Sequence, residues 1–211
     1  ISSFSLALLA SFICILFAIL IIYGVRTNSK IAAPFARIAS LGYSIPGAVA
    51  AVAVLIPLAW IDNIISNFAL QYFNISIGLL LTGSWFALLF AYLVRFLALS
   101  MHSVENSFIK IPISFDYAAK VLGKSNSSIL SNIHARIGLG GISLGLLIVF
   151  VDVLKELPAT MILRPFGLST LAIKAHEFAI DERLGDAAIP LLAIVVVCLL
   201  PLFILARGIR H

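Results

Sequence analysis

Asp152, Lys155 and Glu156 are the residues whose types and spacing best suit chemistry, because they stand together at the end of an apolar stretch. Intervals of three and four residues bring side chains onto one face of a helix, so Asp152 can meet both of the others. Ionisable groups near a bilayer are costly and therefore indicate a function, here a path or gate for a solute. The alternative is that these charges reach the membrane surface and pair there, and both interpretations stay open.

A second polar group follows in the next stretch of chain. Its potential metal ligands are His176, Glu177, Asp181, Glu182 and Asp186. Oxygen-rich clusters suit hard cations, but these residues lack a defined ligand spacing. Lys174 and Arg183 are close enough in sequence to pair with them. The pattern therefore favours a solvated, ion-paired surface, and no firm metal site is predicted.

The composition of the chain indicates what kind of element must position these residues. The chain has 211 residues, of which 62% are hydrophobic and 11% charged, with a mean hydropathy of +1.16. Such hydrophobicity excludes a disordered chain, and two cysteines exclude a disulfide scaffold. A net charge of +5 without a dense basic patch argues against a nucleic-acid partner. The composition therefore predicts an integral membrane protein, with Cys14 and Cys198 as small core residues.

Five membrane-spanning helices are predicted, because a span needs about 20 mostly apolar residues. Four uncharged runs meet that length: Phe4–Val25, Ile38–Ile61, Ile75–Val94 and Ala187–Ala206. A fifth, Ile137–Val151, is shorter and is expected to begin near Asn132 and to continue past Asp152. Pro46–Gly47 is expected to kink the second helix. The small residues of the fourth helix, among them Gly141 and Gly145, predict close packing against its neighbours.

The distribution of Lys and Arg predicts the orientation of these helices. Ten of these residues fall on one side and four on the other, and the richer side is expected to be cytoplasmic. The N-terminus is then outside and the C-terminus cytoplasmic. The outer loops are Asp62–Asn74 and Asp152–Asp186, and Arg95 counts among the cytoplasmic residues.

The longest cytoplasmic stretch, residues 97–136, contains a predicted short amphipathic helix. Ser114 is expected to cap it, Asp116 to occupy its first turn, and Gly123 to end it. Asn126 or Ser127 would cap a second short helix. One face of the first helix is apolar and comprises Phe115, Ala118, Val121 and Leu122. Lys120 and Lys124 are too few for firm lipid anchoring, so docking into a partner protein is favoured.

Two enzymatic interpretations are excluded by content. Residues 118–125 resemble a phosphate-binding loop, but Ala118 replaces its first glycine and no strand precedes it. The predicted spans also contain no nucleophile and base pair and no zinc-binding His-Glu-x-x-His. The chain is therefore expected neither to bind ATP nor to act as an enzyme, and no cofactor is predicted for it.

The segment Asp116-Tyr-Ala-Ala-x3-Gly123-x9-Ile133 resembles the "EAA" loop of binding-protein-dependent ABC importer permeases. In that family the loop forms a coupling helix that seats in a cleft of the ATPase subunit. The family's Glu falls at Tyr117, and its Leu-Pro falls at Ala135 and Arg136. The resemblance implies ATPase-coupling roles for Asp116, Tyr117, Ala118, Ala119, Gly123 and Ile133, within a coupling loop of about residues 112–136.

Further segments are similar to ferric iron importer permeases, in which two homologous halves are fused. These segments are Leu41–Gly47, Lys155–Gly167, Thr170–Ala172, Asp181–Leu184 and Ala187–Pro190. The resemblance implies that residues 1–211 form one all-α transmembrane domain, a type I importer core of five helices, similar to the C-terminal half and N-terminally incomplete. Alternatives are a permease for thiamine, phosphonate or another small solute, and an inactive truncated remnant. The candidates for the translocation path or outer gate are Asp152, Lys155, Glu156, Pro158 and Thr160.

The resemblance also implies partners and a location. ABC ATPase subunits would hydrolyse ATP, a periplasmic binding protein would deliver the solute, and a second permease half would complete the pathway. The chain would then lie in a bacterial cytoplasmic membrane and import ferric iron by alternating access.

Overall fold

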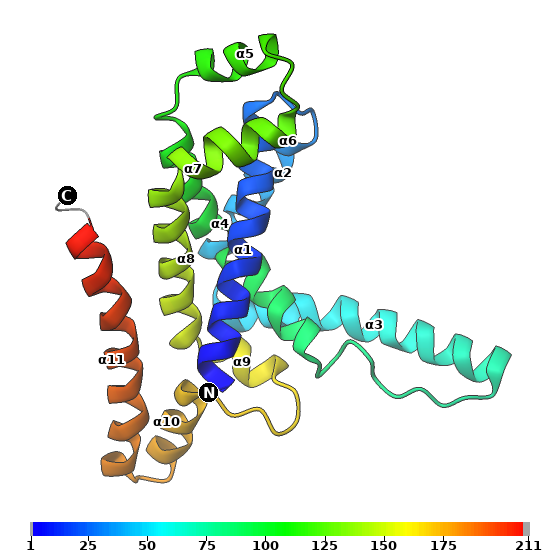
Figure 1. The fold of residues 1–211 in the computed structure, drawn as a ribbon. Helices are drawn as coiled ribbons and strands as arrows, with labels where there is room; N and C mark the ends of the chain where they lie inside the picture. The colour runs from blue at the N-terminus through cyan, green and yellow to red at the C-terminus, as the bar shows by residue number, and fades with distance from the viewer. Residues whose placement is uncertain (1, 209–211) are drawn as a thin grey trace.

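The computed structural model describes residues 2–208, which form helices and no strand. Three helices run side by side as the centre of the molecule: α1 (Ser2–Arg26), α4 (Trp85–Phe108) and α8 (Leu139–Leu154) (Figure 1). Their buried faces are apolar and small, and Leu6, Leu88 and Val149 are almost fully enclosed. The first predicted span is thereby confirmed within one or two residues at each end.

Glycines set the closest approach within this bundle. A Cβ on Gly141 would overlap the Ser107 hydroxyl and would lie 2.5 Å from the Ser103 carbonyl oxygen, both on α4. A Cβ on Gly145 would lie 2.8 Å from Ile15 Cδ1 on α1. The glycine pair therefore brings α8 against both neighbours, as the small-residue pattern predicted.

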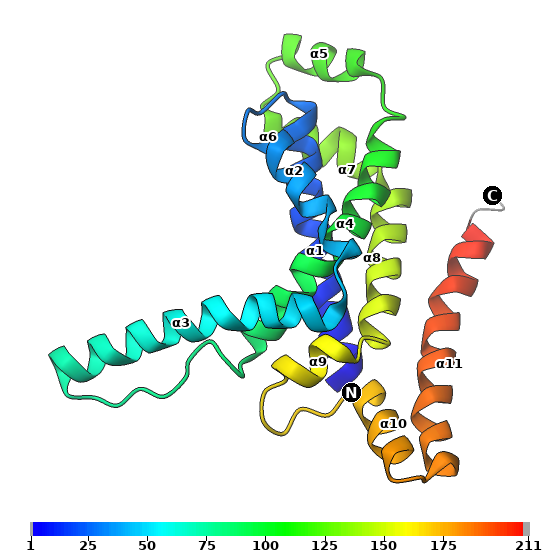
Figure 2. The same ribbon diagram turned by 180° about the vertical axis from the view of Figure 1, so that it is seen from behind.

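The second predicted span differs from the structure. α2 (Ala32–Ser40) and the short turn η1 (Gly42–Ser44) come first, and α3 (Gly47–Phe73) then projects sideways from the bundle (Figures 1 and 2). Pro46 is the residue before α3 and has an extended ψ of 140°, so it starts a helix and does not kink one. The outer loop predicted from Asp62 is wrong, because helix continues to Phe73.

The third predicted span is also shifted. Residues 75–84 are not helical, and α4 begins at Trp85, where Ser84 Oγ accepts a hydrogen bond from the Ala87 N–H. The non-helical segment is fastened to α3 by Asp62, whose carboxylate accepts the backbone N–H groups of residues 80, 81 and 82 at 3.1, 2.9 and 2.7 Å. α4 then continues to Phe108, so the predicted loop start at Leu97 is wrong.

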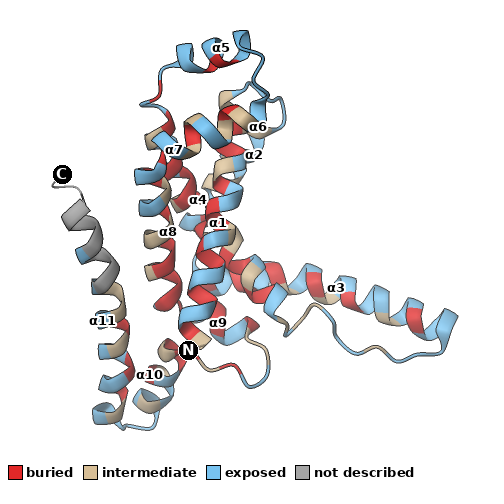
Figure 3. Ribbon diagram, viewed as in Figure 1, coloured by how far each residue is buried: buried red, intermediate tan, exposed pale blue. Residues whose placement is uncertain are grey.

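The C-terminal elements are α9 (Pro158–Leu163), α10 (Leu171–Ile180) and α11 (Leu184–Gly208). By length and apolarity, α1, α3 and α4 can each cross a membrane, and a fourth span results if residues 126–137 and α8 count as one helix bent by 76°. Residues 184–199 of α11, the stretch whose side chains the structure describes without interruption, are also apolar. Exposed residues gather on α3, α5 and α11, whereas buried residues line the facing sides of α1, α4 and α8 (Figure 3).

Candidate functional site

A short helix at one end of the bundle, α5 (Ile113–Val121), occupies the position of the predicted amphipathic helix (Figure 1). Pro112 precedes its first residue, so the predicted cap at Ser114 is wrong. At the other end Gly123 has a φ of +74°, a conformation that favours glycine, as predicted for the helix terminator. Ser125, and neither Asn126 nor Ser127, caps the next helix α6 (Asn126–Ile129).

The apolar face of α5 points away from the chain. Val121 and Leu122 are 88% and 77% exposed, and Phe115 and Ala118 are also exposed. Tyr117 and Gly123 share this accessibility. An exposed apolar surface of this kind marks an interaction site. The four residues predicted to share one helix face thus form an outward surface at the end of the bundle.

The opposite face of α5 is fastened to the chain itself. Ala119 is only 7% exposed and belongs to an apolar cluster with Phe108, Ile111 and Ile129. Ile133 packs against the same cluster. In this structure the small Ala119 side chain therefore packs against its own chain, and its contact with a partner stays a prediction.

Asp116 is the polar anchor of the inner face. Its two carboxylate oxygens lie 2.7 Å from Arg26 Nε and 2.6 Å from His134 Nε2. Burial alone would raise the pKa of the Asp116 carboxyl, but the hydrogen bonds and charges of Arg26 and His134 outweigh it, so the pKa lies below its ordinary value. An ionised carboxylate only accepts hydrogen bonds, so His134 Nε2 carries the proton.

Sequence reasoning missed both partners of Asp116. His134 ends the π-helical turn η2 (Leu130–His134), which leads through α7 (Ala135–Ile137) to α8. Its side chain is fully buried between the rings of Tyr23 and Phe108, with ring centroids 5.3 and 5.0 Å away. From the sequence, Arg26 is identified only as a basic residue after the first span. Asp116 in a first turn signals the need for a partner, but no spacing identifies one 90 residues away.

A second charged site lies among α4, α9 and the start of α3. Arg95 Nη1 forms an ion pair with Glu156 Oε1, and the two side chains are 20% and 6% exposed. A Cβ on Gly47 would overlap this pair, so the glycine makes room for it. The prediction that Arg95 is a cytoplasmic loop residue is wrong, because it lies within α4 at the level of Glu156.

The remaining path candidates lie at the end of α8 and the start of α9, close to Glu156 in the chain. Glu156 Oε1 accepts the Ala159 N–H at 3.1 Å, and Pro158 is the first residue of α9. The buried Thr160 hydroxyl donates to the Glu156 carbonyl oxygen at 2.7 Å and lies 2.6 Å from the Tyr92 hydroxyl. Asp152 is buried and pairs with Lys155 at 2.6 Å, while the Lys155 side chain is 62% exposed. The structure thus buries Asp152, Glu156 and Thr160 and leaves Lys155 and Pro158 exposed.

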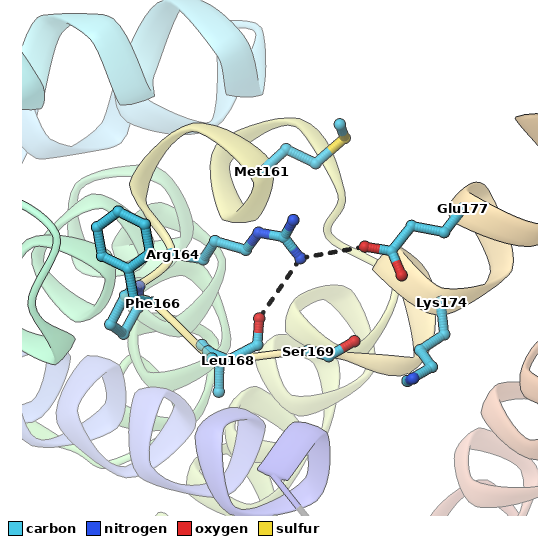
Figure 4. Close-up of a pocket in the computed structure, with 9 residues that line it drawn as sticks. Met161, Arg164, Phe166, Leu168, Ser169, Lys174 and Glu177 are labelled. Carbon is cyan, nitrogen blue, oxygen red and sulfur yellow. Dashed lines mark hydrogen bonds and ion pairs between the residues drawn. The ribbon is translucent and has the colours of Figure 1, made fainter.

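A cavity of about 440 Å³ lies at the opposite end of the bundle from α5, beside the segment between α9 and α10 (Figure 4). Arg164 Nη1 lies 3.4 Å from Glu177 Oε1, and Lys174 also lines the cavity. Asp186 pairs with Arg183 at 2.7 Å, as expected for an ion-paired surface. Among the described residues no three His, Cys, Asp or Glu side chains form a group that could hold a metal.

Comparisons with known proteins agree with this architecture. No protein-family model matches the chain. Over 147 residues, 70% of the chain, it is 23% identical to the "Fe(3+)-transport system permease protein FbpB 2" of Haemophilus influenzae, and the match spans 29% of that protein. A permease chain of the MetNI methionine ABC transporter, solved in inward-facing conformations, superposes with a TM-score of 0.66 at 17% identity, covering 99% of this chain and 92% of that one. The chain therefore has the fold of an ABC importer permease.

Proposed function

We propose that this chain is the permease subunit of an ATP-driven importer and that α5 is the helix that seats on a separate ATPase subunit. The observation that carries the proposal is the orientation of α5. Its apolar residues face outward at one end of a bundle of membrane helices, while Asp116 and Ala119 hold it against the chain. A solvent-exposed Val and Leu on an anchored helix suit a preformed contact. ATP would be bound and hydrolysed by the partner.

The end that carries α5 is assigned to the cytoplasm. Lys110, Lys120, Lys124 and Arg136 are exposed at this end, in agreement with the excess of basic residues on cytoplasmic loops. The N-terminal end of α1 then lies outside together with α9, α10 and the cavity beside Arg164 (Figure 2). In this orientation a periplasmic binding protein would dock near that cavity.

Asp152, Glu156, Pro158 and Thr160 are assigned to the outer part of the translocation path, with Arg95 as a further member. Burial supports Asp152, Glu156 and Thr160, because ionisable side chains at membrane depth usually face a bundle interior or a pathway. Pro158 is exposed and is included because it begins α9 two residues after Glu156. Because Arg95 and Glu156 belong to α4 and the α8–α9 connection, a rearrangement of these elements would break or remake their ion pair. Such an element suits the gate of an alternating-access transporter, completed by a second permease subunit or half.

The proposed solute is ferric iron, on the basis of the sequence similarity to the Fe(3+)-transport permease. Thiamine, phosphonate and other small solutes are alternatives, and an inactive remnant is the outcome if no transport is found. The chain would be co-expressed with its ATPase and binding protein in cells lacking their own ferric importer. Uptake of labelled iron, thiamine and phosphonate is then measured in parallel.

The coupling contact is tested by placing a charge on it. Val121→Asp and Leu122→Asp should abolish uptake and reduce co-purification of the ATPase, because a carboxylate cannot be buried cheaply in an apolar contact. Ile180→Asp is the matched control, since Ile180 is an exposed apolar residue on α10 at the other end. Wild-type uptake and ATPase retention in both α5 variants would refute the proposed coupling surface.

A further inference from the structure

We propose that α1 is a strut that links the coupling helix to the outer surface of the permease, fixed at its cytoplasmic end by a clamp of Arg26, Asp116 and His134. This inference rests on the proposed coupling role of α5. It assigns positioning roles to Arg26 and His134 at one end of α1 and to Ser3 at the other.

Arg26 joins α1 to three places: α5, the end of α4 and the connection between them. Arg26 Nε lies 2.7 Å from Asp116 of α5, Nη1 donates to the Phe108 carbonyl oxygen at the end of α4, and Nη2 donates to the Ile111 carbonyl oxygen in the connection. Both backbone contacts measure 2.7 Å. The planar guanidinium presents its donors in a rigid fork. α5 therefore cannot shift relative to the end of α1 without breaking charged hydrogen bonds.

His134 provides the second attachment of Asp116, but it lies on a helical segment that is sharply bent where it joins α8. The helix of residues 126–137 and α8 meet at an angle of 76° next to Gly138. A movement of α5 that is transmitted through His134 must therefore cross this bend before it reaches α8. α1 is instead one unbroken helix of 25 residues, about 37 Å long.

The far end of α1 is also tied to a specific segment. Ser3 Oγ accepts the Leu171 N–H at 2.8 Å, and Ser2 Oγ donates to the Ser169 carbonyl oxygen at 3.3 Å. Ser169 and Leu168 line the cavity beside Arg164. Between its polar ends α1 is apolar, with Ala7, Ala10 and Ala18 buried against the bundle. The helix thus connects the proposed ATPase contact to the outer segment between α9 and α10 (Figure 1).

This geometry predicts how weakening either attachment of α1 affects the coupling of transport to ATP hydrolysis. If α1 carries the displacement, loosening either end should leave the bundle folded and lower the amount of solute moved per ATP hydrolysed. A contact that only stabilises the fold would instead lower hydrolysis and transport together, in proportion to the folded complex.

The first measurement is amide hydrogen exchange of the purified chain in detergent. Arg26→Gln and Asp116→Asn should each speed exchange of the α5 amides by about tenfold or more, because each removes a charged hydrogen bond. Arg26→Lys keeps the charge but loses the fork and should lie between wild type and Arg26→Gln. Lys110→Gln is the control, since Lys110 is an exposed cation beside the same loop. Unchanged α5 exchange in both disruptive variants would refute the clamp, whatever α5 binds.

The second measurement is transport per ATP in vesicles containing the permease, its ATPase and binding protein. Arg26→Lys, His134→Gln and Ser3→Ala should each lower this ratio, and Ser3→Ala should do so while speeding exchange only around Leu171. The proposed role of α1 as a strut would be refuted if these variants kept the wild-type ratio of transport to ATP hydrolysis although amide exchange showed that α5 or the segment before α10 was loosened. If Val121→Asp also left transport intact, the proposed coupling function itself would fail, which separates the two conclusions.

Discussion

Removing either partner of the ion pair between Arg95 and Glu156 is predicted to destabilise the permease strongly. Their side chains are 20% and 6% exposed, far less than those of a surface pair. Breaking a buried pair by removing one partner costs about 3–5 kcal/mol, because it leaves an uncompensated charge. Arg95→Gln and Glu156→Gln should therefore each lower the free energy of unfolding by about that amount.

The expected loss is large because neither charge has a full alternative set of partners among the described residues. Glu156 retains the Ala159 N–H after Arg95 is neutralised, but Arg95 Nε already lacks a hydrogen-bond partner within that part of the chain. Glu156→Gln should thus be the more damaging change. The double variant should cost less than the sum of the two single changes, because it leaves no unpaired charge.

The assay is unfolding of the purified chain by titration of sodium dodecyl sulfate into mixed micelles, followed by helical circular dichroism. Arg164 and Glu177 provide a matched control pair, with side chains 36% and 50% exposed and a separation of 3.4 Å. Neutralising either should cost about 0–1 kcal/mol. If the Arg95 and Glu156 variants fell within the same range, the assignment of a buried, structurally essential pair would be wrong.

Three further predictions concern packing, acid stability and topology. Gly141→Leu should destabilise the chain by about 1–3 kcal/mol because its side chain meets Ser107, whereas Gly140→Leu, with nothing within 4 Å of its Cβ, should be neutral in the same unfolding assay. The pKa of Asp116 is lowered in the folded chain, so its stabilising contribution is present above the ordinary value of about 3.9 and is lost as the pH falls through the lower folded-state value. Amide exchange of α5 should therefore show an acid transition that Asp116→Asn abolishes. An equal transition in the variant would contradict this. In a chain lacking Cys198, an impermeant thiol reagent should label Phe166→Cys in intact spheroplasts and Leu122→Cys only after lysis, and the reverse pattern would overturn the orientation.

The sequence determined the membrane character of the chain and the presence of a short helix before Gly123. Both follow from local properties. Hydrophobicity along a run reports its preference for lipid, and a glycine at the required position allows the left-handed turn that ends a helix. The first span was accurate because Arg26 ends it immediately after an uninterrupted apolar run.

Helix boundaries inside apolar stretches could not be read in the same way. Residues 75–84 are uncharged yet not helical, and the backbone N–H groups of residues 80–82 bond to Asp62 on α3, a partner that lies outside any local window. Pro46 comes directly before α3 because its extended backbone cannot continue a preceding helix. The second run is apolar on both sides of Pro46, so hydropathy does not mark this boundary. Hydropathy indicates where a segment can reside, and it does not specify which hydrogen bonds the backbone makes.

Only the tertiary structure decided which face of α5 is inward and which charges are paired. Ala119 was expected at the partner contact, but it fills a space on its own chain, so Ala119→Arg would disrupt internal packing as well as any coupling. Asp116 finds Arg26 and His134 at sequence separations of 90 and 18 residues, and Glu156 finds Arg95 on another helix. The amphipathic pattern of α5 defines an apolar and a polar face of the helix, but it does not identify which face packs against the chain. Pairing of buried charges depends on the distance and burial that the packed helices create, and these are set by the whole bundle.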